Sequence, residues 1–153
     1  MKIAVGSDHA GFHLKQKVTG WLLEERFDVQ DVGTYSDARC DYPDYAKRVA
    51  EKVSRGEVER GILVCGSGIG MSIAANKVAG VRAAECFDSY TAQMSRAHND
   101  ANVLCLGAWV VGEEMARTMV LTWLHTPFEG GRHTARVEKI KELERQYLKT
   151  VCV

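Results

Sequence analysis

The sequence has few of the features that mark exported, membrane-bound or nucleic-acid-binding proteins. Its 153 residues carry 20 Lys and Arg against 20 Asp and Glu, so there is no net charge to attract nucleic acid or an anionic membrane. The N-terminus reaches Ser7 and Asp8 before a signal-peptide core can form, and no apolar run approaches the roughly 20 residues of a membrane helix. We therefore expect no export, no membrane partner and no nucleic-acid partner.

Cysteine pairs are also missing. The five cysteines are odd in number, scattered, and nowhere arranged as Cys-x-x-Cys. This pattern argues against a disulfide framework and against a structural zinc site, and free thiols suit a reducing compartment. The sequence therefore predicts a cytoplasmic protein without a metal.

What is present is an alternation of short apolar runs and amphipathic segments. The chain has the length of one compact domain, covering residues 1–153. Apolar runs that predict buried strands lie at residues 2–6, 27–32, 61–65, 81–86 and 102–107. Helical spacing between them, as at Ala116, Val120, Trp123 and Leu124, predicts helices. The fold expected is an α/β, Rossmann-like three-layer sandwich with a five-stranded parallel sheet, which binds ligands beyond the carboxyl ends of its strands.

The last segment has no strand after it. Beyond Pro127 and the Gly130-Gly131 pair, apolar residues at helical spacing predict a final amphipathic helix; they are Val137, Ile140, Leu143, Tyr147 and Leu148. We expect this helix to pack on a partner subunit, with packing on its own core as the alternative.

A glycine-rich loop follows the third predicted strand, which ends in Cys65. The loop contains Gly66, Ser67, Gly68, Ile69 and Gly70. Its backbone N–H groups and the helix that follows favour negative charge, so they could hold an oxyanion and stabilise a Cys65 thiolate. The alternative is a tight turn beside a cysteine of the core.

Three other functions for this loop fit the spacing poorly. A cysteine phosphatase needs an arginine where Met71 stands, and a nucleophile elbow needs Gly-x-Ser-x-Gly. In a dinucleotide fingerprint the third glycine would come one residue later than Gly70. Nucleotide binding remains an alternative.

Asp8 and His9 follow the first predicted strand and should reach the same edge as Cys65. Asp8 could equally be the N-cap of the next helix. His9 and His13 have a spacing compatible with a metal, but no further clustered ligands accompany them, so we expect none.

Two more polar clusters occur later in the chain. One contains His98 and Asn99, and the other contains Arg132 and Arg136, which share a helical face and could grip a phosphate. The alternative for the arginines is a solvated basic face. Helix-to-strand connections lie at the edge opposite Cys65, so these clusters can join one site with it only if a two-fold partner supplies them. We therefore predict a homodimer with shared active sites.

The motifs together resemble type B ribose-5-phosphate isomerases over nearly the whole chain. They are SDHAG at 7–11, DYP at 41–43, CGSGIG at 65–70, SIAANK at 72–77, HND at 98–100 and GGRH at 130–133. The resemblance implies a cofactor-independent isomerase of the pentose phosphate pathway that acts on a sugar phosphate. A tetramer is the alternative to the homodimer predicted above.

The same resemblance implies roles for individual residues. Cys65 is the proton-transferring base, and His98 opens the furanose ring with Asp8. The enediolate oxygens bind at residues 66–70, the phosphate is held by His9, Arg132 and Arg136, and the sugar is positioned by Tyr42 and Asn99.

One position departs from the family pattern, which often has an arginine in the phosphate region where this chain has Trp109. Trp109 either packs at a subunit interface or reshapes the pocket for another sugar length. Six-carbon sugar phosphates, such as allose 6-phosphate or galactose 6-phosphate, therefore remain alternative substrates. A sensor that binds a sugar phosphate or nucleotide without turnover is the non-enzymatic alternative.

Overall fold

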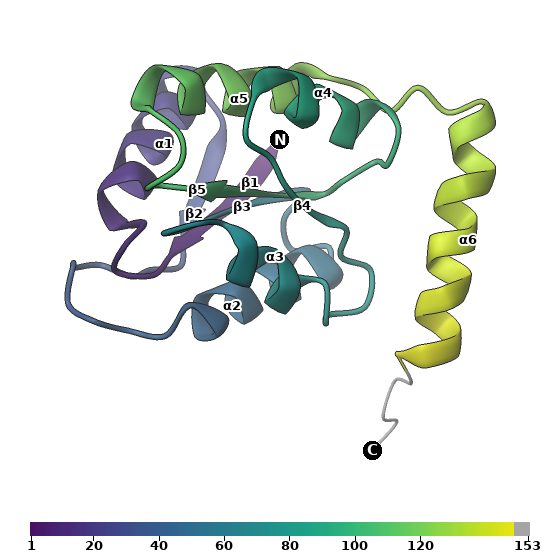
Figure 1. Cartoon of the computed structure of the whole chain (residues 1–153), viewed down its shortest axis with the longest axis horizontal. Coiled ribbons are helices and arrows are strands. Elements are labelled where there is room, and N and C mark those ends of the chain that lie inside the picture. Colours follow the sequence, from purple (N-terminus) through teal and green to yellow (C-terminus); the bar gives the residue numbers. More distant parts are fainter. Residues whose placement is uncertain (149–153) are drawn as a thin grey trace.

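The computed structural model describes residues 1–148, and its strands and helices alternate along the chain (Figure 1). In chain order the elements are β1 (Lys2–Ser7), α1 (Phe12–Glu24), β2 (Asp28–Asp31), α2 (Tyr42–Ser54), β3 (Arg60–Cys65), α3 (Ile69–Ala75), β4 (Ala83–Glu85), α4 (Ser89–Ala97), β5 (Val103–Gly107), α5 (Glu113–His125) and α6 (Arg132–Tyr147).

The five strands form one parallel sheet in the order β2-β1-β3-β5-β4, which confirms the predicted fold class. The strand β4 is shorter than the apolar run at 81–86 suggested. It lies at an edge, where the N–H of Arg82 donates to the Asn102 side chain and the N–H of Ala83 donates to the Asn76 side chain. Side chains thus replace a neighbouring strand at the start of β4.

Alternate residues of the central strands pack into two separate hydrophobic cores. On one face, Ile62 and Val64 of β3 pack with apolar side chains of α1, α4 and α5. On the other face, Leu63 and Cys65 pack with α2 and α3. This period of two explains why the buried strands read as continuous apolar runs, since both faces are covered.

The chain changes direction across the sheet between β1 and β3. It leaves β1 toward β2 and returns to β3 on the other side of β1. The carboxyl ends of the neighbouring strands β1 and β3 therefore border a crevice. The N–H of Asp8, just beyond β1, donates to the carbonyl oxygen of Val64 in β3 at 3.2 Å. Asp8 after β1 and Cys65 at the end of β3 therefore lie at neighbouring strand ends.

The helix α6 stands apart from the two layers, beyond the edge strand β4 (Figure 1). Of its residues only His133 and Val137 are buried, while Ile140, Leu143 and Tyr147 are exposed. A groove of about 580 Å³, lined largely by apolar groups, separates α6 from β4 and its flanking loops. No helix within residues 1–148 is both long and apolar enough to cross a membrane.

Candidate active site

A pocket of about 220 Å³ opens at the carboxyl edge of β1 and β3. It is lined by Asp8, His9, Ala10, Tyr42, Cys65, Gly66, Ser67, Gly70 and Trp109. Seven of these are residues that the sequence proposed for the site, and they come from three separate segments of the chain. Gly68 and Ile69 belong to the same loop but do not line the pocket.

Cys65 is the last residue of β3, and its side chain is almost completely buried at the base of the pocket. The N–H of Gly68 donates to its Sγ at 3.1 Å. Gly68 has φ +87°, a left-handed conformation that few L side chains adopt, and this turn directs its N–H back at the sulfur. The loop therefore aims a backbone hydrogen-bond donor at the sulfur.

The other thiols are in different surroundings. Burial raises the pKa of the Cys86 thiol, and full burial raises the pKa of the Cys105 thiol well above its ordinary value. Cys40 is half-buried in the loop before α2. Cys152 lies outside the described residues, and among the described cysteines only Cys65 lines the pocket.

The loop after Cys65 leads into the first turn of α3. The N–H groups of Ile69, Gly70 and Met71 have no partner within a helix that begins at Ile69, and that of Ile69 donates instead to the Ser67 hydroxyl at 3.3 Å. Backbone donors at this end of α3 can therefore stabilise an oxyanion beside Cys65.

Asp8 and His9 also line the pocket. Asp8 accepts the N–H of Gly11 with Oδ1 at 3.0 Å, so it supports the start of α1 and also lines the pocket. His9 places Nδ1 3.1 Å from the carbonyl oxygen and 3.3 Å from the amide nitrogen of Cys40. These contacts fix the imidazole ring and leave Nε2 available to a ligand.

Two aromatic rings flank the mouth of the pocket. A Cβ on Gly70 would lie 2.6 Å from the Tyr42 ring, and one on Gly66 would lie 2.5 Å from the Trp109 ring. Each ring therefore lies directly on the glycine loop. Trp109 is 79% exposed, so its indole forms an open apolar wall beside Cys65.

The remaining predicted residues lie at the amino ends of the strands, opposite the end that carries Cys65. His98 caps the C-terminus of α4 and Asn99 follows it, before β5 begins, while Arg132 and Arg136 lie in the first turns of α6 and are exposed. None of the four lines the Cys65 pocket. Within the described chain the candidate residues thus form two separate groups.

His133 joins the second group, a contact that the sequence did not indicate. Its ring stacks on that of His98 with centroids 4.1 Å apart and planes 8° apart. Burial lowers the pKa of His133, and the nearby His98, Arg132 and Arg136 lower it further. The two histidines are far apart in sequence, so neither spacing nor composition could have revealed the stack.

A metal could in principle be held by His98, Glu129 and His133, whose ligand atoms all lie within 4.8 Å of one another. However, the Arg132 Nε donates to the His133 Nε2 at 3.4 Å. This contact occupies one ligand atom and brings a positive charge to the same spot. Arg132 thus competes with a cation for His133, while the Glu129 carboxylate lies 3.7 Å from the same nitrogen.

Residues 3–140 match the family model described as Ribose/Galactose Isomerase. Ribose-5-phosphate isomerase B of Escherichia coli is 53% identical, over 95% of this chain and 97% of that protein. D-erythrulose-4-phosphate isomerase of Pectobacterium atrosepticum is 44% identical, over 95% of this chain and 97% of that protein.

The solved structure of Clostridium thermocellum ribose-5-phosphate isomerase B superposes with a TM-score of 0.95 and 53% identity, over 96% of this chain and 99% of the other. Sequence and fold thus agree over nearly the whole length. The chain belongs to the ribose/galactose isomerase family.

Proposed function

We propose that the protein interconverts ribose 5-phosphate and ribulose 5-phosphate by proton transfer through an enediolate, with Cys65 as the base. The observation that carries the proposal is the Cys65 Sγ at the base of the pocket, 3.1 Å from the N–H of Gly68. A similar isomerase from Escherichia coli is named for the same substrate.

The cycle begins with opening of the furanose ring, assisted by His98 and Asp8. The Cys65 thiolate then takes the proton from C2, and the charge that develops on O1 is stabilised by backbone N–H groups of residues 66–70. The O2 proton passes to O1, and the resulting thiol returns its proton to C1, which gives the ketose. General base catalysis and oxyanion stabilisation each typically contribute roughly 100-fold or more.

A second subunit completes this site in our proposal. The Cys65 pocket, at about 220 Å³, is smaller than the roughly 300 Å³ at which ligand pockets usually begin. Apart from His9, its lining has no side chain that could carry a positive charge toward a phosphate. A two-fold partner would bring its own His98, Asn99, Arg132 and Arg136 to the open side.

The helix α6 is the element best suited to the contact between subunits, because its exposed apolar residues border the groove beside β4. A homodimer is thus the smallest active unit that we propose, and a tetramer remains the alternative. A cytoplasmic location likewise stays a prediction.

Substitution of the base tests the proposal. We expect Cys65→Ala to lower kcat for ribose 5-phosphate by a factor of roughly 100 to 10,000, the usual contribution of general base catalysis. Cys86→Ala is the matched control, because this thiol is buried on the other face of the sheet and burial raises its pKa. Wild-type turnover by Cys65→Ala would contradict the role of Cys65 as the base. Circular dichroism verifies that the Cys65→Ala protein is folded.

Six-carbon sugar phosphates are the second candidate substrates, favoured by the exposed Trp109 wall, which alters the space beside Cys65. Turnover compared on ribose 5-phosphate, allose 6-phosphate and galactose 6-phosphate decides between them. Calorimetry that shows binding of all three without any turnover would instead indicate a sensor.

A further inference from the structure

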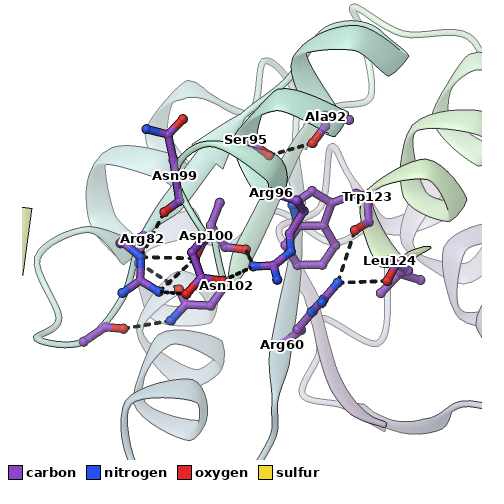
Figure 2. A network of polar contacts seen from close by, with 12 residues as sticks. Arg60, Arg82, Ala92, Ser95, Arg96, Asn99, Asp100, Asn102, Trp123 and Leu124 are labelled. Carbon is purple, nitrogen blue, oxygen red and sulfur yellow. Dashed lines mark hydrogen bonds and ion pairs between the residues drawn. The ribbon is translucent and has the colours of Figure 1, made fainter. Parts of the chain in front are cut away.

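The turn that carries His98 and Asn99 is held by a cluster of charges centred on Asp100 (Figure 2). Asp100 has φ +47°, in the left-handed region that non-glycine residues rarely occupy. The N–H of Asp100 donates to the carbonyl oxygen of Arg96 and that of Ala101 to the carbonyl oxygen of Ser95, so the backbone folds back on the end of α4.

Each oxygen of the Asp100 carboxylate has its own arginine. Arg82 donates to Oδ2 at 3.0 Å, and Arg96 donates to Oδ1 at 2.8 Å. The same guanidiniums also hold the backbone of the turn. Arg82 donates from Nε to the carbonyl oxygens of Asn99 and Asp100, at 3.2 and 3.1 Å, and Arg96 donates to that of Ala101 at 2.6 Å.

This cluster is anchored in the core. The Arg96 side chain is buried, and its guanidinium lies 5.9 Å from the ring centroid of Trp123. Arg60 approaches the same ring at 5.2 Å and donates to the carbonyl oxygens of Trp123 and Leu124 (Figure 2). Burial and the nearby Arg96 lower the pKa of the Arg60 guanidinium to about 10. Asp100 thus provides negative charge where several positive charges converge.

We infer that Asp100 is a positioning residue, which with Arg82 and Arg96 fixes the turn that orients His98 toward the substrate. The inference rests on the proposed role of His98 in ring opening. A catalytic group displaced by about 1 Å can lower the rate roughly 100-fold. A turn held by these charged contacts therefore suits His98, which must act on a substrate in the pocket of the other subunit.

The test separates ring opening from proton transfer. Ribose 5-phosphate must be opened first, whereas ribulose 5-phosphate is already acyclic because its O5 carries the phosphate. Exchange of the C1 hydrogen of ribulose 5-phosphate with D₂O therefore reports Cys65 chemistry without ring opening. We expect Asp100→Asn, which tolerates the left-handed backbone but lacks the charge, to lower kcat/KM for ribose 5-phosphate about 10- to 100-fold and to keep most of the exchange.

Glu57→Gln is the control. Glu57 pairs with Lys52 at 3.0 Å and is exposed to a similar extent as Asp100, but its ion pairs are with Lys52 and Arg55, which belong to neither candidate group. It should leave both rates unchanged. Wild-type turnover by Asp100→Asn, or an equal fall in both rates, would overturn the positioning role.

Two further variants make every outcome decisive. If Asp100→Asn does not fold, Arg82→Lys replaces it, because lysine keeps the charge but lacks the fork that reaches the carbonyls of Asn99 and Asp100. The same selective loss is expected, and wild-type turnover by Arg82→Lys would overturn the inference. If His98→Asn leaves ribose 5-phosphate turnover intact, the proposed role of His98 in ring opening is wrong, independently of the effect of Asp100→Asn.

Discussion

Individual residues of one chemical type have very different surroundings in this protein. Cys65 receives an N–H donor and lines a pocket, while burial raises the pKa values of the Cys86 and Cys105 thiols. Histidines differ in the same way, since His13 is exposed and His133 is buried against His98 and two arginines. The sequence placed Cys65 correctly at the end of a strand, but the burial of each thiol depended on packing.

The lowered pKa of His133 predicts a pH dependence of stability. The groups facing it are His98, Arg132 and Arg136, which disfavour its charge, and Glu129, which favours it. Unfolded histidine binds its proton near pH 6.5, so below that pH the unfolded state binds more protons, and the free energy of unfolding falls until the lowered pKa is passed.

Urea unfolding at pH 7.5 and 5.5 measures this effect. The midpoint of the wild-type protein should fall further between the two pH values than that of His133→Gln. Histidines that do not contact His133 have the same surroundings in both proteins, so their contributions cancel in the comparison. Equal shifts in the two proteins would mean that the pKa of His133 is not lowered.

At the scale of elements, the pattern of apolar residues predicted most of what is seen. The helical spacing of Ala116, Val120, Trp123 and Leu124 marks the buried face of α5. The strand ends were less predictable, as at β4, because side chains of Asn76 and Asn102 take the place of backbone partners there. The helix α6 was expected, and its separation from the sheet explains why its apolar residues remain exposed in one chain.

The exposed side of α6 gives a prediction about assembly. Burial of one leucine contributes about 1.5–3 kcal/mol, and a two-fold interface contains each residue twice, so Leu143→Glu should weaken a dimer by more than 100-fold. Leu23→Glu is a matched control, since Leu23 in α1 is 58% exposed and Leu143 is 56% exposed. Sedimentation should show monomers for Leu143→Glu only. A monomeric wild-type protein, or a dimer that survives Leu143→Glu, would contradict the role of α6.

For the whole molecule, the alternation of strands and helices was sufficient to predict a parallel sheet and the edge at which Asp8 and Cys65 meet. It also predicted that His98 and Arg132 lie at the other edge. Contacts between distant segments could not be read in this way. The stack of His98 on His133 and the pair of Asp100 with Arg82 depend on how α4, α6 and β4 pack, which local patterns do not encode.

Two inactive variants should therefore restore each other. In a hybrid of Cys65→Ala and His98→Ala subunits, one of the two shared sites has both wild-type residues. Random mixing should give about a quarter of the wild-type activity, because half of the dimers are hybrids with one intact site each. Mass spectrometry confirms subunit exchange, and if activity stays at background after exchange, the sites are not shared.

The position of Trp109 also gives the pocket its own optical signal. The sequence contains three tryptophans, and Trp21 and Trp123 are buried, whereas Trp109 is 79% exposed beside Gly66. A water-soluble quencher such as iodide should therefore reach the fluorescence of Trp109 and spare that of the other two. A sugar phosphate that occupies the pocket would shield this indole, so ligand binding can be titrated in the unlabelled protein, even in variants that no longer turn over.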